Sequence, residues 1–160
     1  MKPVVVGISE FRLAWRPVKL VTYGLGSCVA VVLFARDEGI GSMAHIMLPM
    51  AYGNNDTDTP GKFADTAVAG MVRMMEQQGI SPPGIVAKIT GGADMFAGQF
   101  KGKGRRIGAR NILAARKALD NFGIRLVAQD VGGTVGRSVE FMTDTGVLTV
   151  RTLRGGMKEL

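Results

Sequence analysis

Two residues that occur once each in the chain could carry out chemistry together: Cys28 and His45. A cysteine sulfur is a nucleophile and an imidazole is a general base, so the pair could perform thiol-based hydrolysis of an acyl compound. The chain has no second cysteine or histidine to replace either one. A lone cysteine beside valines, or a lone histidine between Ala44 and Ile46, also fits an ordinary packed core residue, so the residue types alone leave both interpretations open.

A working thiol needs more than a base. A free thiol has a pKa of about 8.5, and a neighbouring imidazolium would lower that pKa. A third group should accept the other N–H of the imidazole and hold the ring in place. Thr22 lies shortly before Cys28 and carries a hydroxyl that could do this. The turn at residues 24–27 (GLGS) is rich in glycine, so its backbone N–H groups could bind an oxyanion.

Two expected strands must bring Cys28 and His45 together. Residues 28–34 are rich in valine and indicate a buried strand, and residues 40–48 indicate a second strand that Pro49 ends. If Arg36 pairs with Gly39 across the turn, Cys28 faces Met47, and His45 lies two residues along on the same face. Backbones on such a diagonal are about 7–8 Å apart, which side chains can bridge. A three-residue loop ending at Gly39 would instead place the pair on opposite faces.

The rest of the chain predicts more strands and two helices. Thr59 is the expected N-cap of the first helix, Pro60 its first residue and Gly79 its end. The apolar stripe of this helix is expected to pack on the core; it consists of Ala64, Val68, Met71, Val72 and Met75. The second helix covers residues 107–121, and further strands cover residues 18–25, 85–89, 125–130, 138–142 and 147–151. Thr143 to Gly146 is expected to join the last two strands as a hairpin.

This order of elements indicates an α+β fold, a mixed α/β sandwich in which β-sheet layers carry two main helices on a face. At 160 residues the chain is expected to form one domain over residues 1–160. One cysteine and one histidine cannot form an intrachain disulfide or a His/Cys metal cluster, so we expect neither a metal nor another cofactor. The longest apolar run covers only residues 28–35, whereas a membrane-spanning helix needs roughly 20 residues. With no membrane insertion and a free thiol, a cytoplasmic location is expected.

The net charge of +7 favours acidic partners, although it also serves solubility. The densest basic cluster consists of Lys101, Lys103, Arg105, Arg106 and Arg110. Phe100 is the sole aromatic beside it, which is too little for a surface on which bases stack, so nucleic acid is not an expected partner. The glycine-rich stretches at residues 24–29 and 132–137 do not match a dinucleotide fingerprint.

Five stretches of the chain resemble the CheD family, the chemoreceptor glutamine deamidases of chemotaxis. They are residues 24–31 (GLGSCVAV), 43–49 (MAHIMLP), 88–93 (KITGGA), 107–111 (IGARN) and 132–139 (GGTVGRSV), in the order expected of the family. The first two together are specific. Ser42 and Thr90 depart from the residues common in the family, and neither belongs to the expected chemistry.

The resemblance implies a CheD-like deamidase domain with a fold similar to deamidating bacterial toxins. It implies that Cys28 is the nucleophile, His45 the general base and acid, and Thr22 the group that orients the histidine. The implied reaction is hydrolysis of selected glutamine side chains of methyl-accepting chemotaxis receptors to glutamate, through a thioester on the cysteine. A CheC-type phosphatase is the implied second partner. The basic cluster at residues 101–110 would help docking to an acidic receptor.

Two other functions stay open at this point. A cysteine peptidase or transglutaminase would use the same thioester chemistry, and would cleave chains or incorporate amines rather than release ammonia. A non-catalytic adaptor that binds receptors or the phosphatase would keep its binding after loss of Cys28.

Overall fold

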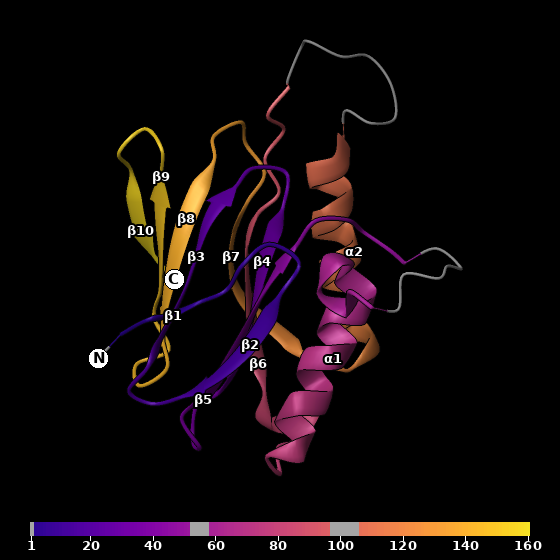
Figure 1. The fold of residues 1–160 in the computed structure, drawn as a ribbon, viewed down its shortest axis with the longest axis vertical. Helices are drawn as coiled ribbons and strands as arrows, with labels where there is room; N and C mark the ends of the chain where they lie inside the picture. Colours follow the sequence, from indigo (N-terminus) through magenta and orange to yellow (C-terminus); the bar gives the residue numbers. More distant parts are fainter. Residues whose placement is uncertain (1, 52–57, 97–105) are drawn as a thin grey trace.

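The computed structural model describes residues 2–51, 58–96 and 106–160. In these ranges two five-stranded sheets lie face to face, and two α-helices cover the outer side of one sheet (Figure 1). The order of layers is therefore sheet, sheet, helices. This arrangement confirms the predicted α+β sandwich with its two main helices on one face.

The first sheet has the strand order β1-β3-β8-β9-β10. Its strands are β1 (Val4–Val5), β3 (Lys19–Leu25), β8 (Arg137–Met142), β9 (Leu148–Thr152) and β10 (Met157–Glu159). The second sheet has the order β2-β5-β4-β6-β7. Its strands are β2 (Phe11–Trp15), β5 (Ile40–Ile46), β4 (Val29–Ala35), β6 (Val86–Gly91) and β7 (Arg125–Val131). The β1–β3 and β6–β7 pairs are parallel and the other pairs are antiparallel.

Two hydrophobic cores separate the three layers. Alternate residues of β4 face opposite sides, so Val29, Val31 and Leu33 pack under the helices while Ala30 and Val32 pack between the sheets. The strand is buried along its whole length, as its continuous apolar sequence predicts. Two methionines of α1 (Ala64–Gln77), Met71 and Met75, serve packing, because both are fully buried in the core under the helices. The core face of α2 (Ile107–Asn121) likewise contains Ile112, Ala115 and Leu119.

The predicted hairpin register of β4 and β5 is confirmed. Ala35 pairs with Ile40, and the same register continues to Ala30 opposite His45 and Val29 opposite Ile46. The turn between them closes with Gly39 N–H donating to Ala35 O at 2.9 Å. Gly39 has a φ of 67°, a backbone conformation that glycine adopts without steric cost.

The start of the first helix differs from the prediction. Pro60 begins a short 3₁₀ helix, η1 (Pro60–Lys62), and Thr59 makes no side-chain capping bond. Phe63 is extended and forms a parallel bridge with Leu48, whose carbonyl accepts the N–H of Ala64 at 3.0 Å. The helix therefore begins at Ala64, because the main chain of the preceding residues pairs with the segment after β5. Strand β5 therefore ends at Ile46, whereas the sequence predicted a strand that continues to Leu48.

Three strands had no counterpart in the sequence prediction: β1, β2 and β10. The predicted hairpin between β8 and β9 is present, with Gly146 N–H donating to Met142 O at 2.8 Å.

An ion pair also connects the two sheets at one end. Arg137 at the start of β8 forms an ion pair of 3.0 Å with Asp130 near the end of β7. No helix in the described ranges is long and apolar enough to cross a membrane.

Candidate active site

His45 is held from the opposite sheet by Thr22. The histidine lies in β5 of the second sheet and the threonine in β3 of the first, and both side chains are buried between the sheets. Thr22 Oγ1 is 2.7 Å from His45 Nδ1. The main chain of His45 is fixed as well, since its N–H donates to Glu10 O at 3.0 Å and its carbonyl accepts from Ser9 N–H at 2.9 Å.

The hydrogen bonds of Thr22 determine which nitrogen of His45 carries the proton. Thr22 Oγ1 is also 2.7 Å from Val6 O. A carbonyl can only accept, so the single hydroxyl hydrogen of Thr22 is donated to Val6. Thr22 Oγ1 must therefore accept from His45, and Nδ1 carries the hydrogen. Nε2 is left as an unprotonated acceptor; it is buried and has no hydrogen-bond partner among the described residues.

Cys28 lies on the same face of the second sheet as His45. It directly precedes β4, one position beyond the pair Val29–Ile46, and its side chain packs against the core between the sheets. Ala30, two residues along on that face, is the direct partner of His45. The alternative with the two residues on opposite faces is therefore excluded. Cys28 is only partly buried.

Burial favours the neutral form of both groups. Desolvation raises the pKa of the Cys28 thiol, and a hydrogen bond from its own backbone N–H opposes this more weakly. Desolvation also lowers the pKa of His45, because the imidazolium loses more hydration than the neutral ring does. The resting site at neutral pH therefore holds a thiol and an imidazole. The expected lowering of the thiol pKa by an imidazolium does not describe this resting state.

The backbone around Cys28 is tightly packed against the end of β6. Cys28 O accepts the N–H of Gly92 at 2.8 Å, and Ala93 N–H donates to Gly26 O at 2.9 Å. Gly91 has a φ of 102°, and a Cβ atom there would collide with Cys28 O. Within the glycine turn, Gly26 N–H donates to Gly24 O at 3.1 Å, whereas Ser27 and Cys28 N–H donate to no main-chain carbonyl in the described ranges.

Asn111 contacts both sides of the site, a role that was not predicted from the sequence. Its side chain is fully buried on α2, and Nδ2 donates to Ser27 O at 2.9 Å and to Met47 O at 3.0 Å. The only sequence signal was its place at the end of the stretch at residues 107–111. By contrast, Ser42 faces away from His45 on β5, and Thr90 donates to Asp130 O at 2.8 Å.

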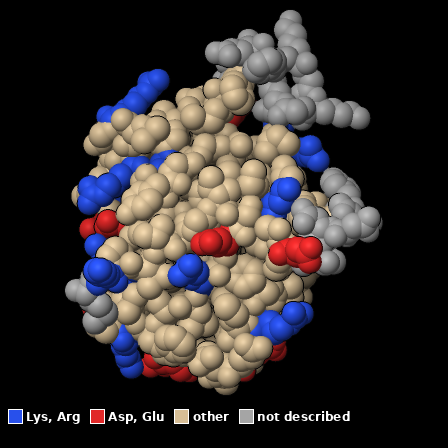
Figure 2. Space-filling model, viewed as in Figure 1, with Lys and Arg blue, Asp and Glu red and all other residues tan. Residues whose placement is uncertain are grey.

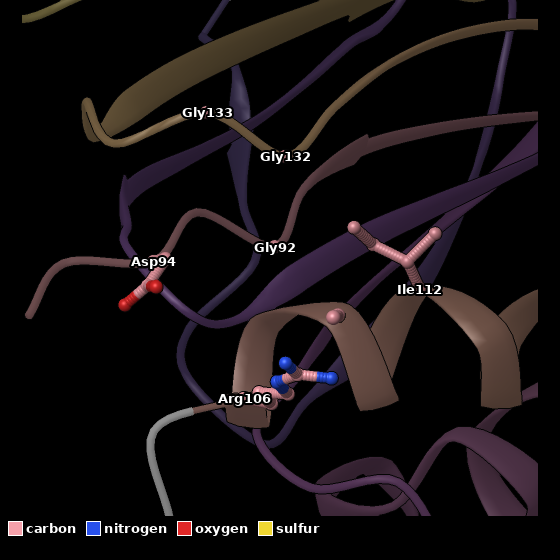
Figure 3. A pocket seen from close by; sticks show the side chains of 7 residues that line it. Gly92, Asp94, Arg106, Ile112, Gly132 and Gly133 are labelled. Atoms are coloured by element: carbon pink, nitrogen blue, oxygen red, sulfur yellow. The ribbon is translucent and has the colours of Figure 1, made fainter. Parts of the chain in front are cut away.

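Two hollows are lined by residues that adjoin Cys28: one by Gly92, whose N–H donates to Cys28 O, and the other by Ser27. The larger, of about 360 Å³, is lined by Gly92, Asp94, Arg106, Ala109, Ile112, Gly132 and Gly133. Figure 3 shows the start of α2 with Arg106 on one side and the backbones of Gly92, Gly132 and Gly133 on the other. The smaller, of about 70 Å³, reaches Ser27 and is lined in part by Met95 and Phe96, which are 43% and 56% exposed.

Charged side chains are scattered over the face drawn in Figure 2. In Figure 2 the Lys and Arg side chains are spread between uncharged areas and do not form one continuous patch on this face. Of the basic cluster, Lys101, Lys103 and Arg105 lie outside the described residues, while Arg106 lines the larger hollow and Arg110 lies in α2. Within the described ranges, no group of three or more His, Cys, Asp or Glu side chains could hold a metal ion.

The fold is an α+β sandwich in which Cys28 and His45 lie on one face of the second sheet and Thr22, on the facing sheet, contacts the histidine. The sequence model of the family described as CheD chemotactic sensory transduction matches residues 47–152, and the chain belongs to this family. The chemoreceptor glutamine deamidase CheD of Thermotoga maritima is 47% identical over 152 residues, which cover 95% of this chain and 93% of that protein. A probable chemoreceptor glutamine deamidase, CheD 2 of Geobacter metallireducens, is 46% identical over 160 residues and 99% of both chains. The resemblance predicted from the motifs is thus confirmed.

The fold also occurs in a protein of known structure. The crystal structure of the Bacillus licheniformis hypothetical protein YfiH superposes with a TM-score of 0.52 at 16% identity. The match covers 78% of this chain and 51% of that one, so this chain spans about half the length of its structural neighbour. At this identity the likeness shows the shared fold alone.

Proposed function

We propose that the chain is a glutamine deamidase of methyl-accepting chemotaxis receptors, with Cys28 as nucleophile, His45 as general base and acid, and Thr22 as the group that orients His45. The observation that carries the assignment of roles is the bond between Thr22 and His45, 2.7 Å long, which leaves His45 Nε2 free to accept a proton. The substrate comes from the deamidases of Thermotoga and Geobacter, to which the chain is similar over nearly its whole length.

The first half of the reaction forms a thioester. The Cys28 thiol passes its proton to His45 Nε2 as Sγ bonds to the carboxamide carbon of the glutamine. His45, now an imidazolium, gives this proton to the nitrogen of the tetrahedral intermediate. The carbon–nitrogen bond breaks and ammonia leaves. Because burial favours neutral thiol and neutral imidazole, proton transfer accompanies the attack rather than preceding it.

The second half of the reaction hydrolyses the thioester and leaves a glutamate side chain on the receptor. His45 Nε2 takes a proton from water, whose oxygen attacks the thioester carbon. The carbon–sulfur bond breaks, the proton returns to Sγ, and the receptor carries a carboxyl group in place of the carboxamide. Thr22 stabilises the imidazolium in both halves, because its hydroxyl oxygen accepts the Nδ1 hydrogen while Val6 holds the hydroxyl hydrogen.

The backbone N–H groups of Ser27 and Cys28 are the proposed oxyanion donors. They lie at the nucleophile and donate to no main-chain carbonyl in the described ranges, and the Cys28 N–H contacts only its own thiol, which moves as Sγ bonds to the substrate. Two N–H groups at this position can stabilise the negative charge that develops on the carboxamide oxygen. The exposed Met95 and Phe96 beside Ser27 offer apolar contacts for the polypeptide that carries the glutamine.

Mass spectrometry of receptor fragments tests the proposal. Incubation with the protein should convert specific glutamines to glutamate, each with a mass gain of about one dalton, and should release ammonia. Cys28→Ala should abolish the conversion, and His45→Gln should reduce it to near background, while both variants keep the unfolding temperature within a few degrees. Conversion by Cys28→Ala at the wild-type rate would disprove the mechanism. Chain cleavage or amine incorporation would indicate a peptidase or a transglutaminase instead.

The proposal extends to partners and location. A CheC-type phosphatase is the second proposed partner, and an adaptor role would show as phosphatase or receptor binding that survives Cys28→Ala. Docking to an acidic receptor is proposed for the basic cluster, and unchanged receptor binding after neutralisation of Lys101, Lys103, Arg105 and Arg106 would contradict it. Catalysis needs Cys28 as a free thiol, which a reducing compartment preserves, so the proposed location is cytoplasmic.

A further inference from the structure

Asn111 connects the two main-chain segments that carry the proposed nucleophile and base. Its Nδ2 donates both hydrogens, one to the carbonyl of Ser27 at 2.9 Å and one to the carbonyl of Met47 at 3.0 Å. Ser27 directly precedes Cys28, and Met47 is two residues after His45. One amide group thus contacts the chain on both sides of the site.

The position of this contact matters because the sheet ladder ends there. The last pair between β4 and β5 is Val29 with Ile46. Beyond it, Met47 N–H donates to Lys62 O at 3.0 Å and Cys28 O accepts from Gly92 N–H at 2.8 Å, so the two segments turn to different neighbours. Among the described residues, Asn111 connects these two segments by hydrogen bonds where the pairing of β4 with β5 has ended.

The helix that carries Asn111 is itself fixed against the end of β6. A Cβ atom at Gly108, one turn before Asn111, would lie 2.5 Å from the carbonyl oxygens of both Gly92 and Ala93, so only glycine lets the helix approach this closely. Asn111 therefore projects from a rigid element. Its Oδ1 is buried and has no hydrogen-bond partner among the described residues.

We propose that Asn111 is a positioning residue: by binding the carbonyls of Ser27 and Met47 it sets the separation of the Cys28 sulfur from His45 Nε2. This inference rests on the roles proposed above for Cys28 and His45, and extends them to a residue on the helical layer. A displacement of about 1 Å between reacting groups can cost on the order of a hundredfold in rate. Loss of both donors should therefore slow catalysis through kcat, with little change in KM.

Alkylation of Cys28 by iodoacetamide tests the inference without any receptor. The rate is measured against pH for the wild type, Asn111→Leu, His45→Gln and the double variant. Thr143→Val is the matched control, because it removes one buried side-chain hydrogen bond, to Val18 O at 2.6 Å, at the other end of β3. Asn111→Leu should slow alkylation near neutral pH about tenfold or more, and the double variant should be no slower than His45→Gln alone. Thr143→Val should keep the wild-type profile.

Three outcomes would overturn the proposal. A folded Asn111→Leu protein with the wild-type pH profile would show that the contact does not position the pair. Rate losses that multiply in the double variant would show that Asn111 acts independently of His45. If Asn111→Leu does not fold, Asn111→Ser, whose one short hydroxyl cannot join both carbonyls, replaces it; failure of both to fold would assign the asparagine to overall stability. The wild type could fail to deamidate receptor fragments while the alkylation rates still show coupling between Asn111→Leu and His45→Gln. That result would refute the proposed substrate and leave this inference standing.

Discussion

Thr22 Oγ1 and His45 Nδ1 are 2.7 Å apart although they belong to different sheets. The threonine hydroxyl donates to Val6 O, so it can only accept from the histidine. The orientation of the ring is thus determined by the packing of one sheet on the other. Because Nδ1 carries its hydrogen toward Thr22, Nε2 is the nitrogen that exchanges protons in the proposed mechanism.

Thr22→Val should lower kcat about a hundredfold, because the ring loses the acceptor that fixes its Nδ1 hydrogen. Thr22→Ser keeps the hydroxyl and should retain most of the activity. Thr143→Val again serves as the control for loss of a buried hydroxyl. Steady-state deamidation kinetics at neutral pH measure all three. Equal activity of Thr22→Val and wild type would contradict the orienting role.

The pH dependence should reveal a neutral resting pair. The pKa of His45 is lowered by burial, so the base stays unprotonated down to a pH below its ordinary value of about 6.5, and activity falls only as pH drops through the lowered pKa. The pKa of the Cys28 thiol is raised by burial, so alkylation by iodoacetamide should accelerate toward a pH above about 8.5. Fast, pH-independent alkylation between about pH 4 and 6 would instead indicate a preformed thiolate–imidazolium pair.

Gly91→Ala should impair both stability and activity. At a φ of 102° any side chain is strained, and here its Cβ atom also meets Cys28 O. Gly79→Ala is the matched control, since Gly79 has a φ of 83° with no other atom within 4 Å of an added Cβ. The control should lose about 1–2 kcal/mol of unfolding free energy from backbone strain alone, whereas Gly91→Ala should lose more and should also deamidate more slowly. Urea unfolding and kinetics distinguish the two, and equal losses would refute the packing argument.

Arg137→Met should lower the unfolding free energy by about 3–5 kcal/mol, because it leaves the carboxylate of Asp130 without its buried partner. The two side chains are 8% and 14% exposed and join the two sheets. Lys158 also pairs with Asp130 at 3.1 Å but is 67% exposed, so Lys158→Ala should cost less than about 1 kcal/mol. The double variant Arg137→Met with Asp130→Leu should recover part of the loss. Chemical unfolding of the four proteins measures these differences.

The strongly patterned parts of the fold could be predicted from the sequence. The valine run and the glycine at position 39 determine the register of β4 and β5, and the register alone places Cys28 and His45 on one face. The apolar stripe of α1 is buried as predicted. By contrast, β1 and β10 are two and three residues long, too short for alternation to appear. The start of α1 was predicted four residues early because Phe63 pairs with Leu48, a contact distant in sequence.

For the candidate site, the sequence revealed the residue types but not the contacts between residues that are distant in the chain. The types and spacing of Cys28, His45 and Thr22 were visible, but not the carbonyl of Val6 that fixes the threonine hydroxyl. Asn111 could not be chosen from the sequence by physical argument, since an asparagine in a helix has no local feature that reveals two carbonyl partners 84 and 64 residues away in the chain.

The proposed site takes a side chain from each layer: Thr22 from the first sheet, His45 from the second and Asn111 from the helices. An incomplete chain, or one in which a layer has opened, therefore retains the reactive cysteine without the machinery that directs it. On the proposed mechanism, activity therefore requires that all three layers have packed.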